Sequence, residues 1–147
     1  TVMTVQSSSS SHFFAAHAEG GVEVELVPQG TLTERLRAGG AGLAGFFTPT
    51  GYGTELTRGK ETRVIDGRGY VYEKALTGDF ALIAANQADP FGNLRYRLAN
   101  RNFNPLMAMA ARHTIAQVRE RVELGAIGPD DVHTPGVYVD QFVEIAK

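Results

Sequence analysis

The run Phe80–Ala85 constrains the fold of this chain more than any other feature, because all six residues are apolar. A strand without alternation of apolar and polar residues is typical of a parallel sheet that helices cover on both faces. The run is far shorter than the roughly 20 residues that cross a bilayer. We therefore predict a central strand of an α/β sandwich, and no membrane partner.

Local patterns predict the elements around this strand. Thr31 and Glu34 have the spacing of a capping box, and the pair Gly39-Gly40 can supply a left-handed helix end, which together predict a helix from Thr31. The turn sequence Asp66–Gly69 predicts a hairpin. Asn104 as cap and Pro105 in the first turn predict a helix over 106–112. Further strands are expected over Val22–Val27, Leu43–Phe47, Leu94–Leu98, Thr114–Val118 and Gly136–Val143, with hairpin strands over Thr62–Ile65 and Tyr70–Lys74 and a short helix over His12–Ala18.

Composition excludes several classes of function. A length of 147 residues with 43% apolar side chains is enough for one domain, 1–147, with one core. The chain has 14 basic and 16 acidic residues, so we expect no broad basic surface that could bind nucleic acid. The absence of cysteine excludes disulfides, a cysteine nucleophile and thiolate metal sites, and it fits a reducing cytoplasm, where we expect the protein.

The segment Gly39–Gly59 contains seven glycines, and within it Gly40–Gly45 satisfies the dinucleotide pattern G-x-G-x-x-G. A dinucleotide site needs these glycines between a strand and the start of a helix, whereas here they follow a predicted helix. No G-K-[ST] follows Gly51–Thr54, so this segment is not a phosphate loop. The remaining interpretations are close backbone packing in an ordered loop, or a backbone-lined pocket for a small ligand.

Few side chains indicate chemistry on their own. The four histidines are widely spaced and predict no metal site, and no G-x-S-x-G elbow is present. The carboxylates near the glycine segment are expected to be solvated: Glu55, Glu61 and Glu73. Gln29, between Pro28 and Gly30, follows the end of a predicted strand, where open α/β sheets place ligand-binding groups. Its local sequence is equally consistent with a residue that begins a helix.

A series of motifs in fixed order resembles the alpha subunit of family I CoA-transferases of the succinyl-CoA:3-oxoacid type. The resemblance covers about residues 20 to 147, and the order of the motifs is far more specific than any one of them. The motifs are Leu26–Thr31 (LVPQGT), Arg37–Gly42 (RAGGAG), Phe47–Thr54 (FTPTGYGT), Gly59–Glu61 (GKE), Gly78–Ile83 (GDFALI), Gly92–Leu94 (GNL), Ala99–Ala110 (ANRNFNPLMAMA) and His133–Gly136 (HTPG).

This resemblance implies a three-layer α/β/α sandwich with a largely parallel sheet. It also implies ping-pong transfer of CoA from succinyl-CoA to a 3-oxo acid such as acetoacetate or 3-oxoadipate, with a glutamate as nucleophile. In the family that glutamate lies in the beta subunit, in an S-E-N-G-like motif that this chain lacks. We therefore expect no catalytic residue here, activity only in a hetero-oligomer with a beta subunit, no metal, and no cofactor besides the CoA thioester substrates.

The resemblance also implies substrate-binding residues. The glutamine of P-Q-G, which faces the substrate carboxylate or carbonyl in the family, matches Gln29, followed by Gly30. The segment that borders the acyl pocket matches Thr48, Gly51, Tyr52 and Gly53. Glycines there let backbone N–H groups approach an anionic ligand.

The chain departs from the family at its amino terminus. The family's first strand, helix, G-G-F-x-x-x-G-x-P loop and the N-N- or N-D-containing segment after it have no counterpart here, so we expect the chain to be the carboxy-terminal portion of an alpha subunit, truncated at the amino terminus. Two alternatives stay open. One is a CoA-transferase with another acceptor, such as acetate or butyrate, and the other is a non-catalytic remnant or scaffold subunit.

Overall fold

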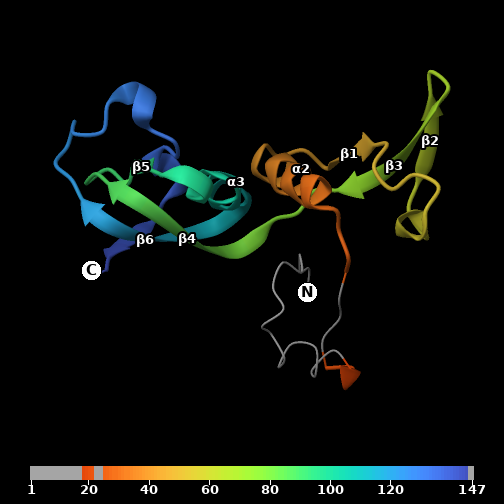
Figure 1. The fold of residues 1–147 in the computed structure, drawn as a ribbon, viewed down its shortest axis with the longest axis horizontal. Coiled ribbons are helices and arrows are strands. Elements are labelled where there is room, and N and C mark those ends of the chain that lie inside the picture. Colours follow the sequence, from red (N-terminus) through yellow and green to blue (C-terminus); the bar gives the residue numbers. More distant parts are fainter. Residues whose placement is uncertain (1–17, 22–24, 146–147) are drawn as a thin grey trace. The chain divides into compact units, whose positions relative to one another are not determined.

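The computed structural model describes residues 18–21 and 25–145 (Figure 1). They form two compact units: the described residues up to Leu32 together with Phe47–Glu73, and Thr33–Phe46 together with the described residues from Lys74 onward. The expected helix over His12–Ala18 lies outside the described residues except for Ala18, and so does the first half of the expected strand Val22–Val27.

The smaller sheet has the strand order β1-β3-β2, with β1 at Gly45–Thr48, β2 at Thr62–Ile65 and β3 at Arg68–Lys74. β2 and β3 are antiparallel and joined by Asp66 and Gly67, whose φ angles are 50° and 75°. Two consecutive positive φ angles are what a two-residue hairpin turn requires. The predicted hairpin is therefore confirmed, while β1 is half-buried and begins two residues later than the expected strand.

Helix α2 spans Gln29–Gly40 and begins two residues before the predicted start. The carbonyl of Pro28 accepts the N–H of Leu32 at 2.9 Å, which places Thr31 inside the first turn. The capping-box prediction is therefore wrong. The hydroxyl of Thr31 is buried without a hydrogen-bond partner among the described residues, and the Glu34 carboxylate accepts a hydrogen bond from Arg37 Nε at 2.8 Å instead.

The carboxyl end of α2 also differs from the prediction. The left-handed residue is Gly42, with φ 71°, and the N–H of Leu43 reaches back to the carbonyl of Ala38 at 2.9 Å. Gly39 and Gly40 remain helical and allow close packing. A Cβ at Gly39 would overlap the Leu76 carbonyl, and one at Gly40 would lie 2.7 Å from the Cβ of Met109. These two glycines therefore serve contacts in the second unit.

The larger sheet has the order β5-β4-β6-β7. Its strands are β4 (Gly78–Ala88), β5 (Leu94–Arg95), β6 (Ala111–Arg121) and β7 (Gln141–Glu144). β4 pairs with β6 and β6 with β7 in parallel, whereas β5 is antiparallel to β4. Helix α3 (Asn104–Ala110) precedes β6 and packs against β4 (Figure 1). The predicted α/β class with a largely parallel sheet is confirmed.

Short 3₁₀ helices connect these elements. They are η1 (Glu55–Thr57), η2 (Leu98–Arg101), η3 (Pro129–Asp131) and η4 (Gly136–Tyr138). The strand expected over Leu94–Leu98 stops at Arg95, because Leu98 has a positive φ of 56° and begins η2. The strand expected from Gly136 starts only at Gln141.

The core of the second unit lies on one face of the larger sheet. Ala81, Ile83 and Ala85 of β4 are at most 4% exposed and are paired in register with Thr114, Ala116 and Val118 of β6, which are also buried. On the opposite face, Phe80 is 68% and Leu82 is 72% exposed. Among the described residues, α3 covers the face that carries Ala81, and the face that carries Phe80 is left exposed. The prediction that both faces of Phe80–Ala85 are covered is therefore wrong for these residues.

Asn104 ties α3 to the sheet instead of capping the helix. Its side-chain amide donates to the carbonyl of Ala84 at 3.1 Å and to that of Asn100 at 2.7 Å, and the cap position is taken by Phe103. Pro105 stands in the first turn as expected, and the helix ends at Ala110 instead of Arg112. This link fixes α3 above the middle of β4.

Candidate functional site: a glycine loop and an arginine-lined hollow

The predicted substrate segment forms a loop between β1 and η1. Gly51 and Gly53 have φ angles of 82° and 77°, which only glycine adopts without strain. The N–H of Tyr52 donates to the Pro49 carbonyl at 3.2 Å, and the Thr54 hydroxyl donates to the Gly51 carbonyl at 2.7 Å. The loop is therefore ordered by its own hydrogen bonds, as the sequence predicts.

The Tyr52 ring is seated against the hairpin. It lies so close to the backbone of Gly69 that a Cβ at this position would overlap the ring. Phe47 of β1 also contacts aromatic and cationic groups of the hairpin. Its ring centroid lies 5.3 Å from that of Tyr72 and 4.8 Å from the guanidinium carbon of Arg63. Tyr52 nevertheless stays 43% exposed, so its ring is accessible to a ligand while its position is set by Gly69.

The expectation that Glu73 is solvated is wrong. Its side chain, on β3, is only 6% exposed. Its carboxylate accepts a hydrogen bond from Lys60 Nζ at 2.7 Å, and Glu25 lies 3.9 Å from the same ammonium group. A carboxylate neutralised in this way is a poor nucleophile. Glu55 and Glu61, by contrast, are exposed as expected.

The six predicted substrate residues fall into two groups within the first unit. Gln29 and Gly30 occupy the exposed first turn of α2. Thr48, Gly51, Tyr52 and Gly53 are brought together by the loop that follows β1, where the Thr48 hydroxyl accepts the N–H of Thr50 at 3.2 Å. Their contact with substrate stays a prediction.

Gly40 is the last residue of helix α2, Gly42 follows the helix, and Gly45 is the first residue of β1. This order, helix then strand, is the reverse of a dinucleotide-binding turn, in which the glycines lead into a helix amino terminus. The structure thus agrees with the rejection of a dinucleotide site.

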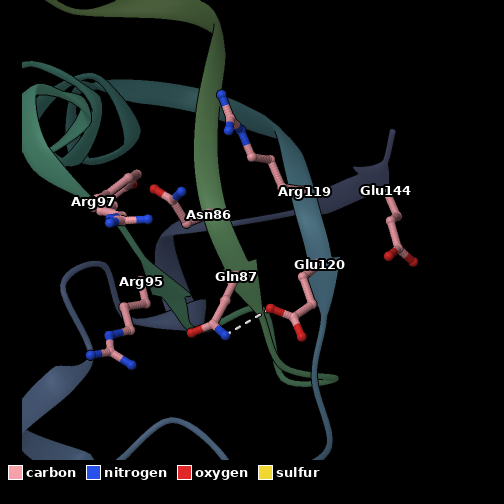
Figure 2. Close-up of a pocket in the computed structure, with 8 residues that line it drawn as sticks. Asn86, Gln87, Arg95, Arg97, Arg119, Glu120 and Glu144 are labelled. Carbon is pink, nitrogen blue, oxygen red and sulfur yellow. Dashed lines mark hydrogen bonds between the residues drawn. The ribbon is translucent and has the colours of Figure 1, made fainter. Parts of the chain in front are cut away.

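A hollow of about 630 Å³ lies in the second unit (Figure 2). Its walls come from residues near the carboxyl ends of β4, β6 and β7 and from the segment that begins with β5. The lining residues are Asn86, Gln87, Arg95, Tyr96, Arg97, Arg119, Glu120 and Glu144. In open α/β sheets, ligands bind outside the carboxyl ends of the parallel strands. The hollow is therefore a second candidate site.

The polar groups of the hollow are only partly satisfied. Gln87 Nε2 donates to Glu120 Oε2 at 2.9 Å, the dashed line in Figure 2. Arg95 lies 3.7 Å from Asp131. The guanidinium groups of Arg97 and Arg119 have no ion-pair or hydrogen-bond partner in the described part of the chain. Asn86 Oδ1 is likewise buried without a partner there. Within the described ranges, the hollow thus presents two guanidinium groups and one acceptor that have no partner.

One wall of the hollow is formed by the buried ring of Tyr96 stacked on the partly exposed ring of His133. Tyr96 stacks on His133 with 6.1 Å between centroids, and its hydroxyl lies 2.9 Å from the Thr134 hydroxyl. Burial raises the pKa of Tyr96. His133 Nδ1 accepts the Tyr96 N–H at 3.0 Å, and the pKa of His133 is lowered by burial and then by the positive charges of Arg101 and Arg95.

Sequence reasoning missed these arginines. Arg95 and Arg97 alternate with Leu94 and Tyr96, a pattern that predicts the exposed side of a strand. A usable signal was present, because the two arginines come shortly after the carboxyl end of the predicted central strand.

Comparison with known proteins places the chain among coenzyme A transferases. The family model of that description matches residues 1–145. The A-subunit of the 3-oxoadipate CoA-transferase of Pseudomonas putida is 53% identical over 139 residues, 95% of this chain and 60% of that protein. The A-subunit of a succinyl-CoA:3-ketoacid coenzyme A transferase of Xanthomonas campestris is 59% identical over 131 residues, 89% of this chain and 54% of that protein. The chain thus spans between half and two thirds of these relatives.

Solved structures resemble the fold. An acyl-CoA transferase of Escherichia coli O157:H7, in a thioester complex with CoA, gives a TM-score of 0.78 at 24% identity over 92% of this chain and 30% of that one. The AibA/AibB decarboxylase variant gives 0.73 at 28% identity over 90% of this chain and 50% of that one. Among the described residues, no helix is long and apolar enough to span a membrane.

Proposed function

Because the chain belongs to the coenzyme A transferase family, we propose that it is the A-subunit part of an enzyme that transfers CoA from succinyl-CoA to a 3-oxo acid, acetoacetate or 3-oxoadipate. The observation that carries the proposal is the identity of 53% and 59% to A-subunits named for 3-oxoadipate and 3-ketoacid transfer. The likeness of the fold to that of an acyl-CoA transferase, over 92% of this chain, is consistent with the proposal.

The proposed reaction is ping-pong, and its nucleophile is a glutamate of a beta subunit. The glutamate carboxylate attacks the thioester carbonyl and releases CoA thiolate, leaving an acyl anhydride. The thiolate then attacks the glutamyl carbonyl, which releases the acid and leaves a glutamyl-CoA thioester. The 3-oxo acid reverses both steps and takes the CoA. The buried carboxylate of this chain's substrate unit, Glu73, is occupied by Lys60, which supports a nucleophile from the partner.

The part of this chain in the reaction is positioning. The Gln29 amide, exposed at the start of α2, donates a hydrogen bond to the substrate carboxylate or carbonyl. Gly51 and Gly53 leave the loop backbone open beside the exposed Tyr52 ring, so that backbone N–H groups can approach an anionic acid. Gly30 and Thr48 border the same acid, and the thioester substrates themselves supply the CoA, without a further cofactor.

A second acceptor class has specific support. The alpha subunit of the acetate CoA-transferase of Escherichia coli K12 is 50% identical over 124 residues, 84% of this chain and 56% of that protein. Acetate lacks the 3-oxo group, so the two acceptors differ in the contacts that they require from the pocket.

The test is reconstitution with a beta subunit. Three samples are compared. The first is the chain alone, and the second is the chain with the B-subunit of the Xanthomonas enzyme. The third is a fusion of the amino-terminal part of the Xanthomonas A-subunit to this chain, with the same B-subunit. Succinyl-CoA is offered with acetoacetate, 3-oxoadipate, acetate or butyrate. We expect transfer to a 3-oxo acid only with the B-subunit, and borohydride should trap a modified glutamate on that partner. Preference for acetate would favour the second acceptor class. No transfer even with the fusion would contradict the proposal that this chain is part of a CoA-transferase.

A further inference from the structure

Under the proposed function, the Tyr52 ring borders the substrate acid, and this ring rests against a different segment of the chain. We propose that Gly69 of strand β3 is a positioning residue, which fixes the Tyr52 ring and thereby the wall that the acid meets. The seat of the ring on Gly69 rests on the structure alone. The contact between the ring and the acid rests on the proposed function.

Space, and not backbone conformation, explains the glycine at position 69. Gly69 is paired in register with Val64 inside the antiparallel hairpin, and its φ angle is not positive. Gly67, which forms the turn, has a φ of 75°. A strand accepts almost any residue, and glycine is disfavoured there unless another group approaches the backbone closely. Gly69 therefore indicates a close contact on β3.

The group in close contact is the aromatic ring of Tyr52. A Cβ at position 69 would overlap the ring carbons Cδ1, Cε1 and Cζ, the last of which carries the hydroxyl. Gly69 shares its face of β3 with Val71, which is 1% exposed, because alternate residues of a strand lie on one face. The ring thus packs on the buried face of the hairpin, and a side chain at position 69 would occupy its place.

The remaining side of the Tyr52 ring is open to a ligand. Tyr52 is 43% exposed, and its hydroxyl has no hydrogen-bond partner in the part of the chain that the structure describes. The ring is therefore held by its contact with Gly69 and not by a hydrogen bond of its own side chain. The hydroxyl and the exposed part of the ring are left to meet the acid.

A side chain at position 69 should move the ring without unfolding the hairpin. The overlap concerns the outer end of a partly exposed side chain, which has room to swing away, whereas the backbone of β3 is held by its pairing with β2. A wall that contacts the acid equally in the ground state and in the transition state contributes to KM and not to kcat. We therefore expect a change in the affinity for the acid.

The first experiment tests the seat of the ring by NMR on the 147-residue chain. We expect nuclear Overhauser effects between the α-protons of Gly69 and the ring protons of Tyr52, and we expect Gly69→Ala to abolish the effects between this ring and the hairpin. Gly78→Ala is the matched control, because an added Cβ at this glycine of β4 meets no atom closer than 3.7 Å. It should leave the effects unchanged. Their absence in the unsubstituted chain would overturn the proposal, and so would their persistence in Gly69→Ala.

The second experiment measures CoA transfer with the B-subunit present and acetoacetate or 3-oxoadipate as acceptor. We expect Gly69→Ala to raise KM for the acid by about tenfold, the factor that one changed contact in a pocket produces, and to leave kcat within about twofold. Gly78→Ala should leave both constants unchanged. Tyr52→Ala should also raise KM, and adding Gly69→Ala to it should cause no further rise, since Gly69 acts through the ring.

Circular dichroism checks that each variant is folded. If the KM factors of Gly69→Ala and Tyr52→Ala multiply in the double variant, Gly69 does not act through Tyr52 and the proposal is overturned. If transfer occurs and Gly69→Ala leaves KM unchanged, the enzyme assignment stands and the role of Gly69 is refuted. If no sample transfers CoA while the NMR contacts behave as expected, the seat of the ring is supported and the transferase assignment fails.

Discussion

The ammonium group of Lys60 lies 2.7 Å from the carboxylate of Glu73, whose side chain is 6% exposed. Removing the ammonium leaves a buried carboxylate without its cation. Breaking a fully buried pair costs about 3 to 5 kcal/mol, and the 28% exposure of Lys60 places this pair at the lower end. We expect Lys60→Met to lower the free energy of unfolding by about 3 kcal/mol, measured by urea denaturation with circular dichroism.

The control is Arg58→Met. Its pair with Glu55 is shorter, 2.6 Å, but both side chains are more than four-fifths exposed, so the loss should stay below about 1 kcal/mol. The double variant Lys60→Met/Glu73→Gln removes both charges and should recover part of the stability. Equal losses in Lys60→Met and Arg58→Met would show that burial of Glu73 has no energetic consequence.

Gln29→Ala is expected to lower the rate of CoA transfer by about 10²-fold, because an amide that donates to a developing charge is worth this factor. Folding should be unchanged, since Gln29 is exposed in the first turn of α2. The measurement is kcat of the chain reconstituted with the B-subunit. Gln141→Ala, an exposed glutamine at the start of β7, is the control of the same residue type. Equal rates for the two variants would remove Gln29 from the site.

His133 is expected to titrate below its ordinary pKa of about 6.5, because burial and the charges of Arg101 and Arg95 disfavour the imidazolium. The unfolded chain then binds the proton first. The free energy of unfolding should therefore fall as pH drops from about 6.5 to the folded pKa, and change no further below it. The shift of the Cε1 proton against pH, followed by NMR, measures this pKa directly.

Arg95→Gln removes one of the positive charges near His133, so it should raise the histidine pKa toward the ordinary value. His133→Gln should abolish the corresponding pH dependence of stability. The prediction fails if the imidazole titrates at or above its ordinary pKa in the folded chain, since the partly buried hydrogen bond from the Tyr96 N–H requires a free Nδ1 lone pair.

Local features were predictable from sequence where the decisive contacts are local. The turn at Asp66 and Gly67 follows from the positive φ angles that its residues accept. The start of α2 was missed by two residues because the Pro28 carbonyl, and not the side chain of Thr31, accepts the first hydrogen bond. The resemblance to CoA-transferases was correct as a family assignment.

Features that depend on distant pairing were not predictable. The hollow requires Gln87 and Glu120 to be partners across β4 and β6, a register that no local pattern specifies. The exposure of Leu82 was missed for a related reason: an apolar pattern shows which faces prefer burial but not which element covers them.

Leu82 and Ile83 are neighbours in β4 on opposite faces, with exposures of 72% and 4%. Ile83→Ser should destabilise the chain by about 3 kcal/mol or more, because it opens a cavity beneath α3 and buries a hydroxyl. Leu82→Ser should leave the free energy of unfolding nearly unchanged and reduce self-association, since it removes apolar surface next to the exposed Phe80. Urea denaturation and sedimentation equilibrium measure the two effects. Equal destabilisation by both substitutions would mean that the Phe80 face is covered in solution, whereas unchanged association in Leu82→Ser would show that this face does not join molecules of the chain.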